Sequence, residues 1–202
     1  MAALADDPLK VDARRERILR ATIEVIKERG FSGTRVADIA AEAGTSQGLV
    51  LYHFTSLAGA LSAAVAFMED EYYGVIDVAA AHQGSPRERL RLMAETAVGA
   101  GPSVGEWRLY LEIWARALHD EQVSAVRASL DARWRFTLIQ VIEEGVASGD
   151  FRTADVRASA WRLACLTDGL AIQLAQEDTE ITPADFVELW WGAACAELGI
   201  DG

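Results

Sequence analysis

Long apolar runs are missing from this chain of 202 residues, in which no stretch of about 18 consecutive apolar residues occurs. A transmembrane helix needs such a stretch, so none is expected. The first ten residues, MAALADDPLK, also lack the basic-then-apolar order of a secretory signal. We therefore expect a cytoplasmic protein.

Cysteine and histidine are also scarce. The two cysteines, Cys165 and Cys195, are too few for a disulfide framework and are better interpreted as small buried side chains. The three histidines, His53, His82 and His119, are not spaced as metal ligands, and neither a phosphate-binding glycine loop nor a paired-carboxylate pattern stands out. We expect no metal, no cofactor and no catalytic residues.

Runs of alternating β-branched residues are absent as well, which excludes a sheet and favours an all-α protein. Glycine, proline and capping residues divide the chain into nine expected helices, three in an N-terminal part and six in the remainder. One helix start, at Ser85 to Glu88, carries a capping box with proline at the first helical position, and the run Thr182-Pro183-Ala184-Asp185 opens the last helix. The expected helices cover about residues 12–29, 34–43, 46–54, 56–81, 85–98, 106–119, 122–147, 155–176 and 182–198.

Residues 34–54 read as two short helices joined by a tight turn. Thr34 is placed to cap the first helix with its hydroxyl, and Gly44 is placed to end it. Four apolar residues spaced three and four apart share one face of this helix: Val36, Ile39, Ala40 and Ala43.

The second of these helices is expected to start at a cap formed by Thr45 or Ser46 and to span about two turns. Its apolar residues Leu49, Val50 and Phe54 can pack back on the first helix. The residues left pointing outward are Ser46, Gln47, Gly48, Tyr52 and part of Leu51. This is the helix-turn-helix pattern, in which the second helix enters the major groove of DNA.

The segment GFSGTRVADIAAEAGTSQGLVLYHF, residues 30–54, follows one amphipathic helix and precedes about 145 mostly helical residues. It resembles the TetR family of transcriptional repressors, most closely over residues 11–61. The resemblance implies a disordered arm at residues 1–9, a three-helix DNA-binding domain at 10–55, and a six-helix ligand-binding and dimerisation domain at 56–202. It also implies one or two phosphate contacts near the start of the first helix, which carries Arg14, Arg15 and Arg17, and a solvated helix face is the alternative for these arginines.

Within the helix-turn-helix, Ser46 and Gln47 are predicted to face base edges, where glutamine can pair with adenine, and Gly48 is predicted to permit close approach. The residues predicted to contact phosphates are Thr34, Arg35, Thr45, Tyr52 and His53. Packing against the first helix is the alternative for Tyr52. The chain departs from the family at Leu57, where a phosphate-binding lysine is common, and at Leu51, where a tyrosine is common.

Charge is distributed unevenly along the chain. Residues 10–60 hold eight basic and six acidic side chains, a net +2, whereas residues 61–202 hold eleven basic and twenty-three acidic ones, a net −12. The phosphate field would orient such a molecule with its N-terminal part toward DNA. An acidic surface that aids solubility is an alternative explanation, and both can hold.

Aromatic residues gather in the C-terminal part. Trp107, Tyr110, Trp114 and Trp134 can wall an apolar cavity in which Glu112 or Asp168 holds a cation, although aromatics at helical spacing are also ordinary core residues. The segments EWRLYLEIWARALHDEQ, SLDARWRFTLIQVIEEGVASGDF and LTDGLAIQLA resemble the choline-sensing (BetI-like) subgroup. We expect an apolar, aromatic or cationic effector, with the helix from about residue 56 as the lever that links its binding to DNA release.

The last two expected helices carry apolar residues on more than one face, so something must cover them. We expect a homodimer in which two copies of this helix pair form a four-helix bundle. A two-fold dimer would select a near-palindromic operator.

Two other functions compete with the regulator. The run Gly44-Thr45-Ser46-Gln47-Gly48 fits the G-x-S-x-G motif of α/β-hydrolases, but a helical segment precedes it where that motif needs a strand. A helical small-molecule sensor or adaptor without DNA binding is the second alternative, because Leu57 stands where the family commonly has lysine.

Overall fold

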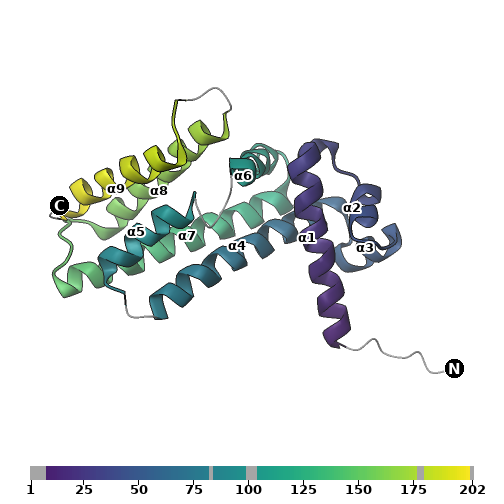
Figure 1. Ribbon diagram of the computed structural model, residues 1–202, viewed down its shortest axis with the longest axis horizontal. Helices are drawn as coiled ribbons and strands as arrows, with labels where there is room; N and C mark the ends of the chain where they lie inside the picture. The colour runs from purple at the N-terminus through teal and green to yellow at the C-terminus, as the bar shows by residue number, and fades with distance from the viewer. Residues whose placement is uncertain (1–7, 82–83, 99–103, 177–179, 201–202) are drawn as a thin grey trace. The chain divides into compact units, whose positions relative to one another are not determined.

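The computed structural model describes residues 8–81, 84–98, 104–176 and 180–200. These residues form nine helices and contain no strand, so the all-α prediction is confirmed (Figure 1). The helices are α1 (Pro8–Gly33), α2 (Val36–Glu42), α3 (Gln47–Phe54), α4 (Leu57–Ala81), α5 (Pro86–Thr96), α6 (Val104–Ala117), α7 (Glu121–Ser148), α8 (Val156–Ala175) and α9 (Pro183–Leu198).

The chain divides into two compact units that do not follow the expected boundary at residue 55. The N-terminal unit consists of Met1–Glu69 and Glu112–Val126, and the C-terminal unit consists of Asp70–Leu111 and Arg127–Gly202. Three helices, α4, α6 and α7, therefore contribute residues to both units. The proposed disordered arm lies largely outside the described residues, and α1 already begins at Pro8.

In the N-terminal unit, α1, α2 and α3 pack around buried aliphatic side chains from each helix, including Ile18, Ile39 and Val50. Burying such side chains is the main stabilising contribution in a domain of this size. An ion pair between Arg29 on α1 and Asp38 on α2, 2.7 Å long, adds a directed contact between the two helices. This packing fixes α3 against the rest of the unit.

A sharp corner joins α3 to α4, which are bent by 68°. Thr55 adopts φ +65° there, and the Ser56 side chain accepts a hydrogen bond of 3.0 Å from the Gly59 amide, which caps α4. Among the described residues no single helix has the length and apolar composition of a membrane span, and α3 joined to residues 57–71 is the one bent pair that meets that test.

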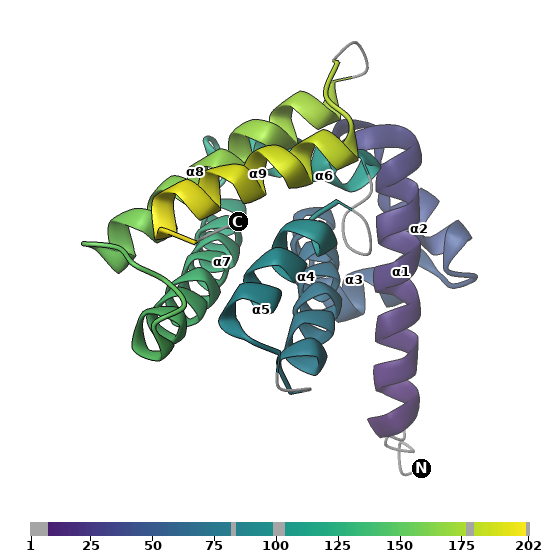
Figure 2. The same ribbon diagram turned by 60° about the vertical axis from the view of Figure 1, so that its left-hand side comes forward.

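In the C-terminal unit, α8 and α9 lie side by side, and α5 packs against α9 (Figures 1 and 2). Trp190 of α9 is almost fully buried, and its indole N–H donates to the Thr167 hydroxyl of α8 at 2.8 Å. A buried indole N–H is costly without a partner, so this bond specifies how the two helices align.

The expected capping box at the start of α5 is present, and α9 begins with a capping box as well. The Ser85 hydroxyl accepts from the Glu88 amide at 3.2 Å while the Glu88 carboxylate accepts from the Ser85 amide at 2.7 Å. Thr182 and Asp185 form the same reciprocal pair at the start of α9, with distances of 3.2 and 2.9 Å. Local sequence alone therefore determines where α5 and α9 begin.

Several helix ends differ from the expected ones. The predicted loop at residues 99–105 lies mostly outside the described residues, and α6 begins within it at Val104. The prediction that Thr34 caps α2 was wrong, because the residue that precedes α2 is Arg35 and the Thr34 hydroxyl donates to the Gly30 carbonyl at 2.7 Å. Gly30 interrupts the helical geometry of α1 with φ +69°, as expected of a helix-ending glycine.

Candidate functional site

The outward face of α3 is the exposed surface that the sequence predicted. Ser46, Gln47, Gly48 and Tyr52 are all exposed, and Tyr52 keeps 79% of its surface accessible. Because Tyr52 projects outward, packing against the first helix of the helix-turn-helix, α2, is not its role. Gly44 adopts φ +60° in the turn before α3 and so permits the tight connection that presents this face.

Ser46 has a structural role that leaves it able to make a further contact. It is the N-cap of α3, and its hydroxyl oxygen accepts a hydrogen bond from the Leu49 amide at 3.2 Å. The hydroxyl hydrogen can still donate outward. The segment that precedes Ser46 is the helix α2, so the strained strand-to-helix turn of a hydrolase nucleophile is not formed at this serine.

Thr34 does not support the phosphate contact predicted for its side chain. The residue is only 3% exposed, and its hydroxyl is already bonded to Gly30. Arg35, in contrast, is exposed, and its amide donates to the Asp38 carboxylate at 3.1 Å. We therefore assign Thr34 to the junction between α1 and α2 and keep Arg35 and the half-buried Thr45 as predicted phosphate contacts.

Positive charge near the end of α3 comes from α1. The pKa of His53 is lowered, first by burial and then by the positive charges of Arg14 and Arg15. Its Nε2 atom is buried without a hydrogen-bond partner in the part of the chain that the structure describes. Arg15 also lies over the ring of Phe54, 5.3 Å from its centroid. His53 is thus a neutral group beside two cationic ones, and its phosphate contact remains a prediction.

Glu112 of α6 is a residue whose role the sequence did not reveal. Its carboxylate accepts a hydrogen bond from the backbone amide of Phe31, and the guanidinium of Arg116 lies over the Phe31 ring at 5.1 Å. A Cβ atom at Gly30 would come within 2.8 Å of the same carboxylate. Glu112 therefore holds the end of α1 within the N-terminal unit, and the prediction that it binds a cationic ligand is not supported.

Gly48 is open to substitution as far as the fold is concerned. Apart from its chain neighbours and its own helix backbone, a Cβ atom there would meet only the Ser46 hydroxyl oxygen among the described residues, at 3.9 Å, and the backbone is not left-handed. Alanine should therefore raise helix stability by up to about 1 kcal/mol. A side chain on the outermost face of α3 would nevertheless hold the backbone away from DNA.

We expect Gly48→Ala to melt at or above the wild-type temperature and yet to bind operator DNA at least about tenfold more weakly. Thermal melting followed by circular dichroism and titration with labelled DNA would measure the two effects. Unchanged DNA affinity would show that close approach at this position is not needed.

The five residues predicted to bind a ligand are divided between the two compact units. Trp107 and Tyr110 form a buried pair with ring centroids 5.3 Å apart, and the Trp107 indole donates to the Ala97 carbonyl at 3.1 Å. Trp134, half-buried, and Asp168 lie in the same C-terminal unit, whereas Trp114 belongs to the N-terminal unit. Trp107 and Tyr110 are thus packed as core residues, and the aromatic cage stays a prediction.

Asp168 lies on α8 in an electrostatically unusual place. The pKa of its carboxyl is raised to about 6, mainly because surrounding protein displaces water and also because the Asp131 carboxylate adds like charge. Arg127 and Arg135 oppose this shift without cancelling it. The pKa of Asp131 is raised as well, chiefly by burial. This pair of acidic groups on α7 and α8 therefore favours a cation or a proton beside it.

The raised pKa of Asp168 predicts a pH-dependent stability. Between the ordinary value of 3.8 and about 6, the folded chain holds a proton that the unfolded chain releases. The stabilising contribution of the neutral acid is thus fully present below pH 3.8 and is lost as the pH rises through 6.

Asp168→Asn should be more stable than wild type at pH 7.5, and this advantage should shrink toward zero near pH 4. Urea denaturation at several pH values and one protein concentration would measure it. Glu143→Gln, on the exposed surface of α7, serves as a control and should show no such trend. A constant difference across the pH range would contradict the assignment.

The fold and the site together define a helix-turn-helix transcriptional regulator, with the DNA-reading helix in its N-terminal unit and a second, larger helical unit. Residues 18–64 match the model of bacterial regulatory proteins of the tetR family, and residues 86–191 match the BetI-type transcriptional repressor C-terminal model. The chain belongs to the TetR family, with a BetI-type C-terminal region. Members of this family are regulators and not enzymes.

Curated relatives support this assignment. The HTH-type transcriptional regulator BetI of Stenotrophomonas maltophilia is 31% identical over 122 residues, which cover 59% of this chain and 62% of that protein. BetI of Pseudomonas aeruginosa is 28% identical over 163 residues, covering 78% of this chain and 79% of the relative.

Solved structures show the same fold. A TetR-family transcriptional regulator from Rhodococcus sp. superposes with a TM-score of 0.81 at 28% identity, covering 93% of this chain and 99% of that one. A transcriptional regulator from Saccharomonospora viridis in complex with choline gives a TM-score of 0.78, also at 28% identity, with coverages of 89% and 94%.

Proposed function

We propose that this chain is a ligand-responsive regulator, most consistent with a repressor, that binds a near-palindromic DNA operator as a homodimer in the cytoplasm. The observation that carries this proposal is the outward face of α3, where Gln47 and Tyr52 are exposed beside an open Gly48. Gln47 and Ser46 read base edges at the N-terminal end of α3. Arg35, Thr45, Tyr52 and His53 contact phosphates and fix the register.

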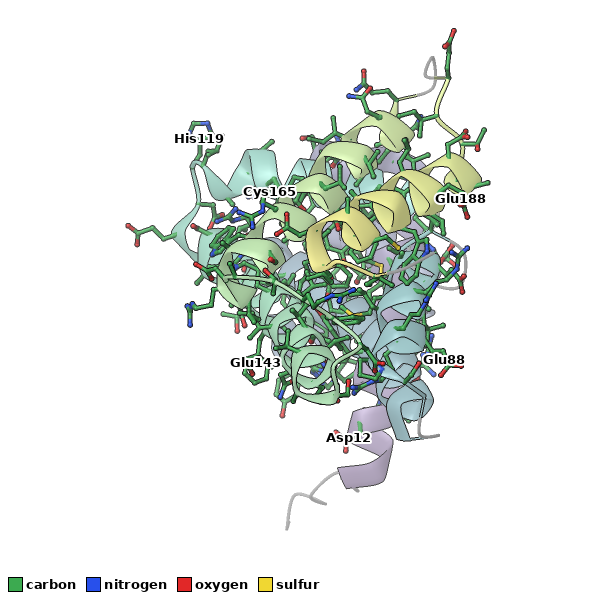
Figure 3. All side chains as sticks on the ribbon, turned by 90° about the vertical axis from the view of Figure 1, so that its left-hand side faces the viewer. Asp12, Glu88, His119, Glu143, Cys165 and Glu188 are labelled. Atoms are coloured by element: carbon green, nitrogen blue, oxygen red, sulfur yellow. The ribbon has the colours of Figure 1, made fainter. Side chains whose placement is uncertain are left out.

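The homodimer is supported by apolar side chains left exposed on α8 and α9. Trp161 and Leu189 are 51% and 53% exposed, and Ile172 of α8 is also exposed. These exposed apolar side chains lie on α8 and α9, the two helices on which Figure 3 labels Cys165 and Glu188. Gly169 and Gly192 have open space at their Cβ positions among the described residues, so a second helix can approach closely. A second copy of the chain packed over these side chains would remove their apolar surface from water.

A small cationic effector is supported by the acidic pair and by one related structure. The Saccharomonospora viridis regulator, 28% identical to this chain, was solved with choline. In this chain a cation near Asp168 would offset the loss of water and the Asp131 charge that raise the pKa of the Asp168 carboxyl. An effector that prefers the DNA-incompetent form would lower operator affinity by its differential binding and by no more. The helices α4, α6 and α7, which supply residues to both units, are the candidates for transmitting that preference.

Selection of bound duplexes from a random pool at a stated salt concentration tests the proposal. We expect enrichment of a palindrome whose half-site centres lie about 34–36 Å apart. Sedimentation at micromolar concentration should show a dimer, and finding only monomer would exclude the two-fold arrangement.

Two substitutions test whether Gln47 reads bases while Tyr52 binds phosphate. Gln47→Ala should change the base preference at one position per half-site, with a discrimination loss of about 1–3 kcal/mol. Tyr52→Phe removes one phosphate-binding hydroxyl and should weaken binding evenly across sequences. Competition titrations with operator and random duplexes would separate the two. Equal effects of both variants on both kinds of DNA would refute this division between base readout and phosphate binding.

A sensor without DNA binding is the second candidate function, and Leu57 is the observation that favours it. Leu57 begins α4, where a lysine would supply a phosphate contact, and it is half-buried. Losing one such contact should make the slope of the logarithm of the binding constant against the logarithm of the salt concentration shallower by about 0.9 per half-site. A chain that forms dimers but enriches no sequence from the random pool would favour this candidate.

A further inference from the structure

Leu51 is an apolar side chain on the reading face of α3. It is 42% exposed, although Val50 beside it is completely buried. Gln47 and Leu51 are four residues apart, so they lie on the same flank of the helix, one turn from each other. A single exposed leucine is unremarkable on most surfaces. On this helix Leu51 lies on the same side as Gln47, the residue proposed to contact base edges.

The chemistry of leucine narrows what Leu51 can recognise in the major groove. Guanine, adenine and cytosine present hydrogen-bond donors and acceptors there, while thymine adds a C5-methyl group. Leucine has neither donor nor acceptor, so it gains nothing from a phosphate or from the polar edges of the bases. The thymine methyl is the natural group in the groove that an exposed isobutyl side chain can bury against itself.

Gly48 leaves room for such a contact beside Leu51. It carries no side chain, and in the part of the chain that the structure describes the contact given for a Cβ atom at that position is Ser46 Oγ, at 3.9 Å. The exposed part of Leu51 is therefore not screened by a side chain at residue 48. A methyl group on a base edge can approach the apolar surface of Leu51 while Gln47 reaches a neighbouring base.

We propose that Leu51 is a specificity-determining residue that selects thymine through its C5-methyl group, close to the base that Gln47 contacts. The inference rests on the proposed reading of DNA by α3. Four residues of helix rise about 6 Å and adjacent base pairs are about 3.4 Å apart, so the thymine lies within about two base pairs of that base. Each half-site then contains at least one A·T pair at or near the base that Gln47 contacts.

The test replaces thymine with deoxyuridine in the operator enriched by the wild-type protein. This change removes the methyl group and keeps the Watson–Crick edge. It is made at one position at a time, symmetrically in both half-sites. Burial of one methyl group predicts about a fourfold loss of affinity per half-site, or about fifteenfold for a dimer, at one thymine position. With Leu51→Ala the ratio of thymine to uracil affinity at that position should fall close to one.

Two further variants sharpen the result. Leu118→Ala removes a leucine that is 79% exposed outside α3, and it should keep the wild-type ratio. Leu51→Met keeps an apolar side chain of similar volume and should also retain a preference for thymine. This variant reports on the contact even if Leu51→Ala fails to fold.

The outcomes separate the two proposals. If an operator is enriched but no thymine responds to uracil, or if the response persists unchanged in Leu51→Ala, the role proposed for Leu51 is wrong and DNA binding by α3 stands. If the wild-type dimer enriches no operator, the proposed function fails and the role of Leu51 fails with it.

Discussion

A Gly59→Ala variant should lose most of its sequence-specific DNA affinity. An alanine Cβ at this position would overlap the carbonyl oxygen of Phe54, the last residue of α3, and would lie 3.3 Å from the Ser56 hydroxyl oxygen. Overpacking of this kind costs about 1–3 kcal/mol. The chain can relieve it by shifting the end of α3. If undoing that shift on binding costs about 2–3 kcal/mol, operator binding weakens by about 30- to 160-fold.

Gly74→Ala is the matched control for this result, because it makes the same substitution in the same helix. A Cβ atom at Gly74 meets nothing within 4 Å among the described residues. This variant should bind the operator as wild type does, with equal or slightly higher stability. Fluorescence anisotropy with operator and random duplexes measures both variants. If Gly59→Ala binds as tightly as Gly74→Ala, the corner does not set the position of α3.

The second large effect is expected at Gly145 of α7, in the C-terminal unit. A Cβ atom there would overlap the ring of Phe151, which is 1% exposed, and the Phe151 amide donates to the Gly145 carbonyl at 2.9 Å. The ring cannot move away without breaking that bond or its own packing. Gly145→Ala should therefore destabilise the protein by about 3 kcal/mol and lower the melting temperature by roughly 6–12 °C.

A smaller side chain at position 151 tests whether the overlap with the Phe151 ring causes the loss of stability in Gly145→Ala. Phe151→Leu removes part of the ring and should cost about 1–2 kcal/mol alone. If the overlap is responsible, the double variant Gly145→Ala with Phe151→Leu should lose clearly less than the sum of the two single losses. Strict additivity in urea denaturation would point instead to a cause in the backbone of α7.

Local signals in the sequence predicted much of this fold. Gly30 and Gly44 break helices because they adopt left-handed conformations, and Ser46 caps α3 because its hydroxyl meets the Leu49 amide. The reciprocal pairs of Ser85 with Glu88 and of Thr182 with Asp185 depend on residues three apart. Such contacts form within one helical turn, so a single sequence contains them. The outward face of α3 followed from helical periodicity in the same way.

The sequence could not reveal features that depend on contacts between distant residues. Glu112 and Phe31 are 81 residues apart, and no local pattern indicates that they meet. Thr34 looked like a helix cap because its residue type is common there, but the structure buries it. The raised pKa of Asp168 arises mainly from water that the surrounding protein displaces at the carboxyl, and also from Asp131 on another helix. The division into two units, in which part of α6 belongs to the N-terminal unit, also depends on contacts between distant residues.

The contact of Glu112 with Phe31 bears on how this protein can be re-engineered. A chimera that transplants operator choice onto a different regulator would ordinarily take the first 55 or 69 residues and discard the remainder of the chain. Such a transplant would leave the Phe31 amide and the Gly30 bend without the carboxylate that secures them. The transferable module is therefore discontinuous in sequence, and a chimera must also include residues 112–126.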